Sequence, residues 1–182
     1  MGAILFDEAD LPMESLYTTC DYLTISWSED LKREGWDDKA MSCYVPYRHV
    51  VLLYEHSGFS GRSSVLDPGY HPNAEAMGIP VKSLSSLRTL PYTEGRPLLT
   101  LFEHADYRGD MRNFFENTGA RSLKISRFND CTTSIIVSIG TWELFEHSDY
   151  RGKRWVLKPG RYRNSGAAGI DNDKISSVRL IE

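Results

Sequence analysis

The chain has 182 residues and a formal net charge of −4, with acidic and basic residues interspersed, and it contains three cysteines, Cys20, Cys43 and Cys131. This length fits one domain or two small ones, the charge pattern lacks the basic stripe of a nucleic-acid-binding protein, and no apolar run approaches the length of a membrane span. Three thiols cannot build a disulfide framework and fit a reducing compartment, and because the amino-terminal residues show no secretory signal, we expect a cytoplasmic protein.

A recurring phrase divides the chain into repeats. It reads LFEHADYRG at 101–109, LFEHSDYRG at 144–152 and, more loosely, LYEHSGFSG at 53–61. Each copy is followed by a polar loop near the end of its repeat: SLSS at 83–86, NDCTTS at 129–134 and NDKISS at 172–177. A repeat of this length is one supersecondary unit that buries its apolar face against its neighbours.

The first repeat, residues 1–47, is a degraded copy. The segment DDKAMS at 37–42 has the form of the later polar loops, and counting back from it aligns ILFDEAD at 4–10 with TLFEHAD at 100–106. The glycine of the recurring phrase is missing, with Met13 in its place. The one helix-like stretch, SEDLKR at 28–33, is expected to form a turn or two inside a connection.

The other repeats, 48–92, 98–139 and 140–182, have a β pattern. Short apolar segments at 50–54, 98–102 and 134–138 are rich in β-branched residues, and turn signals follow at short intervals. A Pro-Gly step in VLDPGY at 65–70 and VLKPGRY at 156–162 marks the second and fourth repeats only. The order A-B-A-B predicts two antiparallel sandwich domains, 1–92 and 98–182, joined by a Gly- and Pro-containing linker at 93–97.

Two signatures that occur together in register resemble the βγ-crystallin superfamily. One is an aromatic residue, a second aromatic five residues later and a glycine two further on, as in Phe102, Tyr107 and Gly109. The other is the loop Asn/Asp, Asn/Asp, two free positions, Ser/Thr, Ser, which is intact at 129–134 and 172–177. The resemblance covers essentially the whole chain, strongly in 50–182 and weakly in 1–49. It implies an all-β fold of two βγ-crystallin-like domains, each a β-sandwich of two Greek-key motifs.

The residues of the recurring phrase also suit a structural role. Gly61, Gly109 and Gly152 stand where a tightly folded hairpin needs positive φ, which glycine adopts without steric cost. The serines that end the loops, Ser86, Ser134 and Ser177, can hydrogen-bond hairpin backbone groups that would otherwise be unsatisfied. We therefore interpret the aromatics and glycines of the phrase as structural.

The polar loops suit a different task, because their carboxylates and hydroxyls are hard oxygen ligands of the kind that Ca²⁺ takes. In the calcium-binding members that the chain resembles, two loops of one domain face each other. Each of two sites then takes an acidic oxygen from one loop, a hydroxyl from the other, and backbone carbonyls from the loop and the hairpin. The resemblance implies the pairs Asp130 with Ser176 and Asp173 with Thr133, and carbonyl ligands from Cys131, Lys174, Glu103 and Glu146. The alternative is that such loops are ordinary turns with local side-chain hydrogen bonds.

The first domain departs from the pattern. Its first loop keeps Asp38 but has Met41 where the hydroxyl belongs, and its second loop has Lys82 in place of the acid. The surviving halves, Asp38 and Ser85, belong to one site, which the carbonyls of Lys39 and Glu55 would complete. The resemblance thus implies three Ca²⁺ ions per chain, two in the second domain and one in the first.

Other chemistry is less well supported. His56, His104 and His147 occupy equivalent places in three repeats, so they should lie on separate hairpins and not converge on zinc. No catalytic triad, paired carboxylates or phosphate-binding loop stands out, and we expect no enzyme. The leading interpretation is a calcium-binding protein whose ions clamp paired loops. The alternatives are a purely structural lens-type or stress crystallin, and an adhesion or delivery module of a larger assembly; self-association or another protein partner stays open.

Overall fold

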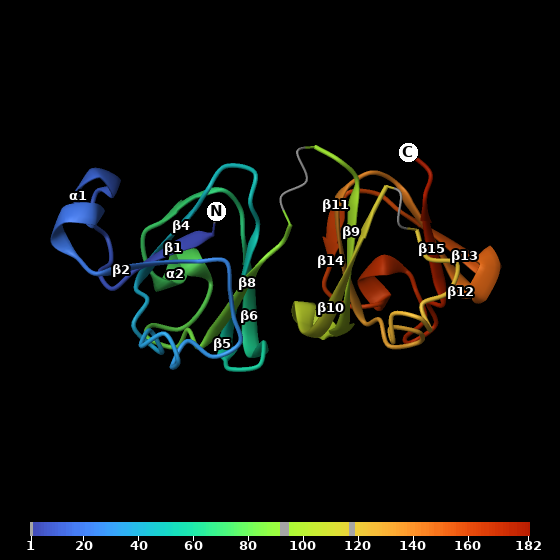
Figure 1. The fold of residues 1–182 in the computed structure, drawn as a ribbon, viewed down its shortest axis with the longest axis horizontal. Helices are drawn as coiled ribbons and strands as arrows, with labels where there is room; N and C mark the ends of the chain where they lie inside the picture. Colours follow the sequence, from blue (N-terminus) through green and yellow to red (C-terminus); the bar gives the residue numbers. More distant parts are fainter. Residues whose placement is uncertain (1, 92–94, 117–118) are drawn as a thin grey trace. The chain divides into compact units, whose positions relative to one another are not determined.

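The computed structural model describes residues 2–91, 95–116 and 119–182, and it is an all-β protein (Figure 1). The chain divides into two compact units, Met1–Tyr92 and Thr93–Glu182. The predicted fold class, two sandwiches of paired Greek-key motifs, is confirmed. The predicted linker begins with Thr93 and Glu94, which lie outside the described residues, while residues 95–97 precede the first strand of the second unit.

The first unit contains two four-stranded antiparallel sheets, with the strand orders β2-β1-β4-β7 and β3-β8-β5-β6. Their strands are Ala3–Phe6 (β1), Tyr22–Ile25 (β2), Trp27–Ser28 (β3), Ser42–Val45 (β4), Val51–His56 (β5), Ser60–Leu66 (β6), Gly69–His71 (β7) and Ser86–Thr89 (β8). Two helices accompany them, Met13–Thr19 (α1) and Ala74–Met77 (α2).

The second unit repeats this plan with the sheets β10-β9-β11-β14 and β13-β12-β15. Its strands are Leu98–His104 (β9), Arg108–Phe115 (β10), Ser134–Ile139 (β11), Trp142–His147 (β12), Arg151–Leu157 (β13), Gly160–Tyr162 (β14) and Ser177–Leu180 (β15). Three short 3-10 turns lie at Ala105–Tyr107, Ser148–Tyr150 and Gly166–Ala168. In the described part of the chain, no helix has the length and apolar character needed to cross a bilayer.

The two motifs of each unit exchange strands. In the first unit β7, which follows the Pro-Gly step, pairs with β4 of the preceding motif, and β3 of the first motif pairs with β8 of the second. In the second unit β14 pairs with β11. A single bridge between Ala120 and Val178 takes the place that the pairing of β3 with β8 has in the first unit. Each sandwich therefore needs both of its motifs, which explains why the repeats alternate in type.

One hydrophobic core lies between the two sheets of each unit. Strand residues two apart along the chain point into it, as Val51 and Leu53 do in β5 and Leu99 and Leu101 do in β9. The second core contains two tryptophans, Trp142 and Trp155, and Trp142 is fully buried. Because each unit has a core of its own, each has the means to be stable by itself.

The hairpin of the first motif differs from the other three, and α1 was not predicted. The alignment of this motif is nevertheless supported at Asp10, which is left-handed (φ 57°) like Asp106 (φ 57°) in the equivalent place. Beyond Asp10 the chain forms α1 in place of the tight hairpin tip, and Tyr17 of that helix packs edge-on against Phe6 at 5.5 Å. The stretch 28–33 begins at Ser28, the last residue of β3, and forms the expected turn from Leu31 onward, with no helix.

Candidate metal centre

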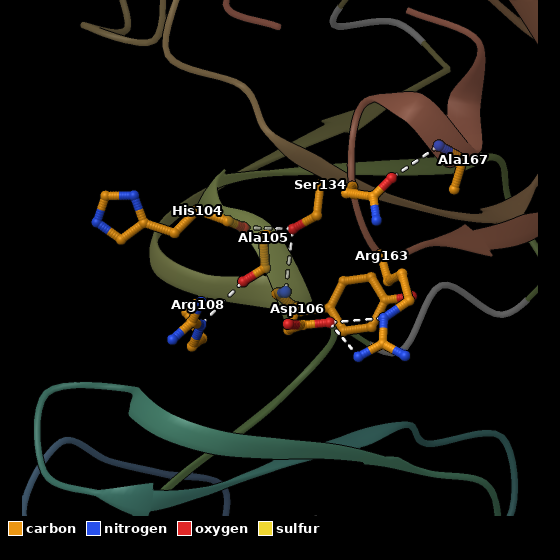
Figure 2. A network of polar contacts seen from close by, with 9 residues as sticks. His104, Ala105, Asp106, Arg108, Ser134, Arg163 and Ala167 are labelled. Carbon is orange, nitrogen blue, oxygen red and sulfur yellow. Dashed lines mark hydrogen bonds and ion pairs between the residues drawn. The ribbon is translucent and has the colours of Figure 1, made fainter.

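A single serine hydroxyl holds each folded hairpin. In the four motifs the last serine of the polar loop donates to the carbonyl two residues beyond the first aromatic: Ser42 to Glu8 (2.7 Å), Ser86 to His56 (2.6 Å), Ser134 to His104 (2.5 Å) and Ser177 to His147 (2.7 Å). In three motifs the same oxygen also accepts from the backbone N–H of the second aromatic, as Ser134 does from Tyr107 at 3.0 Å (Figure 2). The predicted role of the loop serines is confirmed.

The hairpin tips are strained and are fixed by the opposite motif. Asp106 and Tyr107 both have positive φ, 57° and 61°, and the predicted positive φ of Gly109 is observed at 71°. The N–H of Asp106 donates to the carbonyl of Arg163 at 2.7 Å, and the Nε of Arg163 returns a bond to Asp106 Oδ1 at 2.7 Å (Figure 2). The tip of the fourth motif makes the matching backbone bond, from Asp149 to Arg121. These contacts fix each hairpin tip against the other motif of its domain.

The polar loops share one backbone conformation. Their second position is left-handed in all four motifs, with φ of 56° at Asp38, 51° at Lys82, 55° at Asp130 and 53° at Asp173. The N–H of Asp130 donates to the carbonyl of Ile175 in the opposite loop at 3.1 Å, and Asp38 does the same to Leu84 at 3.1 Å. The two loops of a domain therefore face each other, as the resemblance implied.

The hydroxyl-bearing position of each loop is tied to a hairpin. The N–H of Ser176 donates to the carbonyl of Phe145 at 2.9 Å, and that of Thr133 to Phe102 at 3.0 Å. The next hairpin residues, Glu146 and Glu103, are the ones whose carbonyls were predicted as ligands. Each hydroxyl-bearing residue thus bonds, through its backbone, to the hairpin residue just before the one whose carbonyl is a predicted ligand.

One predicted pair is in direct contact. The hydroxyl of Ser176 donates to Asp130 Oδ1 at 3.0 Å, across the two loops. Asn129 and Asn172 each donate to the aspartate that follows, Asn172 at 2.7 Å, and so brace the carboxylates. A cavity of about 470 Å³ opens beside this contact, and it is lined by Lys124, Asn129, Asp130, Glu146, His147, Ser148, Arg151, Asp173, Lys174 and Ser176.

The second predicted pair is not in contact. Within the described residues, the structure gives no hydrogen bond between Asp173 and Thr133. Burial raises the pKa of the Cys131 thiol, and the neighbouring carboxylates of Glu103, Asp173 and Asp130 raise it further. The thiol of Cys131 is directed at the carbonyl of Asn129, 3.0 Å away, so its own carbonyl is the group left for a ligand role.

In the first domain the surroundings of Asp38 are different. A smaller cavity of about 280 Å³ is lined by Asp7, Asp21, Trp36, Asp38, Lys39 and Lys82. Burial raises the pKa of the Asp38 carboxyl, and the charge of Asp37 adds to this, while His56 opposes it. The N–H of Ser85 donates to the carbonyl of Tyr54, the residue before Glu55, at 3.1 Å. The backbone of Ser85 therefore makes the same hydrogen bond to its hairpin as the backbone of Ser176 does in the second domain.

Sequence reasoning missed the basic rim of the larger cavity. Lys124, His147, Ser148 and Arg151 all line it beside the predicted ligands. Arg151 is the next-to-last residue of the recurring phrase and could have been noticed there, whereas Lys124 carries no signal in the sequence. Among the residues that the structure describes, no three His, Cys, Asp or Glu side chains converge as a metal-binding group. A cation held by these loops would therefore depend on hydroxyls and carbonyls as well as carboxylates.

The comparisons with known proteins agree with this architecture. A family model described as Beta/Gamma crystallin matches residues 21–90 and 98–181, which leaves out the stretch with β1 and α1. Gamma-crystallin D of Homo sapiens is 35% identical over 131 residues, covering 71% of this chain and 73% of the human protein. Gamma-crystallin-1 of Xenopus laevis is 30% identical with the same coverage.

The fold of the whole chain also has a counterpart among solved structures. Geodin, a beta-gamma crystallin from Geodia cydonium, superposes with a TM-score of 0.70 at 18% identity, and the match covers all of both chains. At that identity the similarity concerns the fold alone. Because the family model matches most of both sandwiches in register with their motifs, this chain belongs to the beta/gamma crystallin family.

Proposed function

We propose that this crystallin binds Ca²⁺ at its paired polar loops and that the ions clamp and stabilise its domains. The observation that carries the proposal is the contact between Ser176 and Asp130, which joins a hydroxyl of one loop to a carboxylate of the other at 3.0 Å. Two oxygens that the proposal assigns to one ion already lie together, beside a cavity. No chemical reaction is assigned to the chain.

The donor set suits a hard cation. Asp130 and Ser176 would give side-chain oxygens to the first site, and the carbonyls of Cys131 and Glu146 would complete the protein's share; Glu146 also lines the cavity. Ca²⁺ takes roughly six to eight oxygens, often with water among them, so this share leaves positions for water. The left-handed backbone at Asp130 and Asp173 is the kind of strain that functional loops retain.

The proposed number of ions is three per chain. The second domain has both acids and both hydroxyls, Asp130 with Ser176 and Asp173 with Thr133, and would take two ions. The first domain keeps only Asp38 and Ser85, with the carbonyls of Lys39 and Glu55, and would take one. Lys82, which lines the same cavity as Asp38, should weaken that ion by charge repulsion.

Calorimetric titration of the full chain, after removal of bound metal by a chelator, tests the proposal. The unmodified protein should bind three ions, and Asp130→Ala, Asp173→Ala and Asp38→Ala should each lower the count by one. Asp171→Ala is the matched control: it removes an exposed carboxylate next to the fourth loop, one that pairs with Lys153 at 3.0 Å, and the count should stay at three.

Two results would contradict the scheme. A count of four would mean that Met41 and Lys82 are tolerated as ligand positions. No heat of binding and no effect of millimolar Ca²⁺ on the melting curve would remove the calcium proposal altogether. The second candidate would then stand: a purely structural crystallin, which is suggested by the 35% identity to a gamma-crystallin.

A further inference from the structure

The cavity beside Asp130 contains more than the ligands of one ion. Its volume is about 470 Å³, whereas a water molecule takes up about 30 Å³ in the liquid. Its walls include Lys124 and Arg151, neither of which belongs to a polar loop. Ser148, which stands where the third motif has Ala105, adds a hydroxyl that lies 3.2 Å from that of Ser122. The space and the donors fit a second, anionic occupant.

Formal charges in this cavity balance when no ion is present. Three carboxylates, those of Asp130, Glu146 and Asp173, face three cationic side chains, those of Lys124, Arg151 and Lys174. A bound Ca²⁺ would add two positive charges to walls that are otherwise neutral overall. The cavity would then attract an anion only after the ion is in place, because the added positive charge attracts an anion strongly over such short separations.

The cationic side chains are available for this role. Across residues 2–91, 95–116 and 119–182, the ammonium groups of Lys124 and Lys174 make no ion pair. The side chain of Arg151 is 74% exposed and makes a loose pair with Asp149, at 3.9 Å, while its Nε donates to the carbonyl of Ser148 at 3.3 Å. An exposed pair of this kind is worth little and can be exchanged for a ligand.

We propose that a phosphate group binds in this cavity together with the calcium ion, with its oxygens filling open positions on the metal and meeting Lys124 and Arg151. The proposal rests on the proposed calcium site. A phosphate suits the walls because it has several acceptor oxygens and a charge near −2 as a monoester at neutral pH, about what the ion adds. Arginine offers it two parallel donors, and lysine offers a point charge.

The first domain provides an internal contrast. The cavity beside Asp38 has three carboxylates, those of Asp7, Asp21 and Asp38, against two lysines, and it is smaller, at about 280 Å³. One ion there would leave less positive charge and less room. The phosphate site is therefore assigned to the second domain alone.

Titration of the full chain with glycerol 3-phosphate, in saturating Ca²⁺ and in chelator, tests the proposal. Binding should need Ca²⁺, and the phosphate should raise the calcium affinity of one site by the same factor in return. The variant Lys124→Gln/Arg151→Gln should lower phosphate affinity at least tenfold and keep its full count of calcium ions. The matched control, Lys158→Gln/Arg161→Gln, makes the same charge change in this domain at residues that do not line the cavity, and it should bind phosphate normally.

A second arm identifies the source of the phosphate. If the source is a lipid headgroup, vesicles of phosphatidylcholine with phosphatidic acid should sediment the unmodified chain in Ca²⁺, and Lys124→Gln/Arg151→Gln should stay in solution. Binding of glycerol 3-phosphate without vesicle binding would indicate a soluble phosphate. If calcium binds and neither phosphate binds, or if the control loses binding as much as the test variant, the phosphate proposal is wrong and the calcium proposal stands. If no calcium binds, both are wrong.

Discussion

At the scale of single residues, one hydroxyl per motif holds a strained hairpin. Ser134 is fully buried, and its oxygen serves both the carbonyl of His104 and the N–H of Tyr107. Ser134→Ala leaves the buried N–H of Tyr107 and the partly buried carbonyl of His104 without this partner, and an unsatisfied buried group costs about 1–3 kcal/mol. We expect the free energy of unfolding of the second domain to fall by roughly that amount or more, measured by urea denaturation.

The control for this change is Ser138→Ala on the same strand, β11. Ser138 is only partly buried and should change the free energy of unfolding by less than about 0.5 kcal/mol. Equal losses in the two variants would show that the effect comes from the strand and not from the hairpin bonds.

A buried thiol makes the first domain sensitive to alkaline pH. Burial raises the pKa of Cys43 from 9.0 to about 12, so the folded state holds the proton where the unfolded state releases it. This contribution to stability is complete below pH 9 and is lost as the pH rises toward 12. Each such group steepens the loss by up to about 1.4 kcal/mol per pH unit, and Tyr54, whose pKa burial also raises to about 12, adds to it.

Urea denaturation of the first domain between neutral pH and pH 11 measures that slope. Cys43→Ala should make the slope shallower, although the cavity it leaves lowers stability at neutral pH. Tyr47→Phe changes a side chain that is 75% exposed and should leave the slope as it was. An unchanged slope in Cys43→Ala would mean that the thiol does not cause the loss of stability at high pH.

The residues of the candidate site could be predicted only in part. Asp130, Ser176 and their loop partners stand at regular places in a repeated loop, and the family resemblance then implied how they pair. Lys124 could not, because it lies in an irregular segment whose path depends on the contact between Leu123 and Ser176, a backbone bond of 2.8 Å that no local pattern encodes. The basic rim of the cavity is therefore a property of the tertiary structure.

At the scale of elements, α1 is the clearest departure from the predicted pattern. Its sequence, MESLYTT, is short, and a helix of seven residues has little intrinsic stability in water. What holds it is tertiary: Tyr17 lies 5.5 Å from Phe6 and 5.4 Å from Tyr22, ring centroid to ring centroid. Contacts of this kind are invisible to periodicity, whereas the strands around it repeat every second residue and were predictable.

Removal of that aromatic anchor should release the helix alone. In Tyr17→Ala, hydrogen exchange at the amides of α1 should become fast while β1 and β4 keep their protection, because an aromatic pair is worth about 0.5–1.5 kcal/mol beyond its area and the core lies elsewhere. Tyr47→Ala, another exposed tyrosine, should leave α1 protected as before. Loss of protection throughout the sheet in Tyr17→Ala would mean that α1 is part of the cooperative core.

At the scale of the whole molecule, the order of repeats was enough to predict the architecture. The Pro-Gly step of the second and fourth repeats leads into β7 and β14, the strands that cross to the preceding motif. The alternation of two kinds of repeat therefore indicated two sandwiches, in each of which a strand of the second motif joins the sheet of the first. The exact limits of the domains were harder, since the linker sequence carries only its glycine and proline as signals.

Two separate cores and an unequal number of proposed ions lead to a prediction about the unfolding of the full chain. Calorimetry in chelator should resolve one transition per domain, or one broad transition that calcium splits. Calcium should move the transition of the second domain further, because two sites there contribute about 2.7 kcal/mol each at a hundredfold excess over the dissociation constant, against one weaker site in the first domain. For a domain of this size each kcal/mol corresponds to roughly 4–8 °C.

Asp130→Ala/Asp173→Ala should abolish the larger shift and leave the smaller, and Asp38→Ala should do the reverse. A larger shift in the first domain would mean that Asp38, with its carboxyl pKa already raised by burial, is the stronger ligand, and that the count of surviving loop halves does not set affinity.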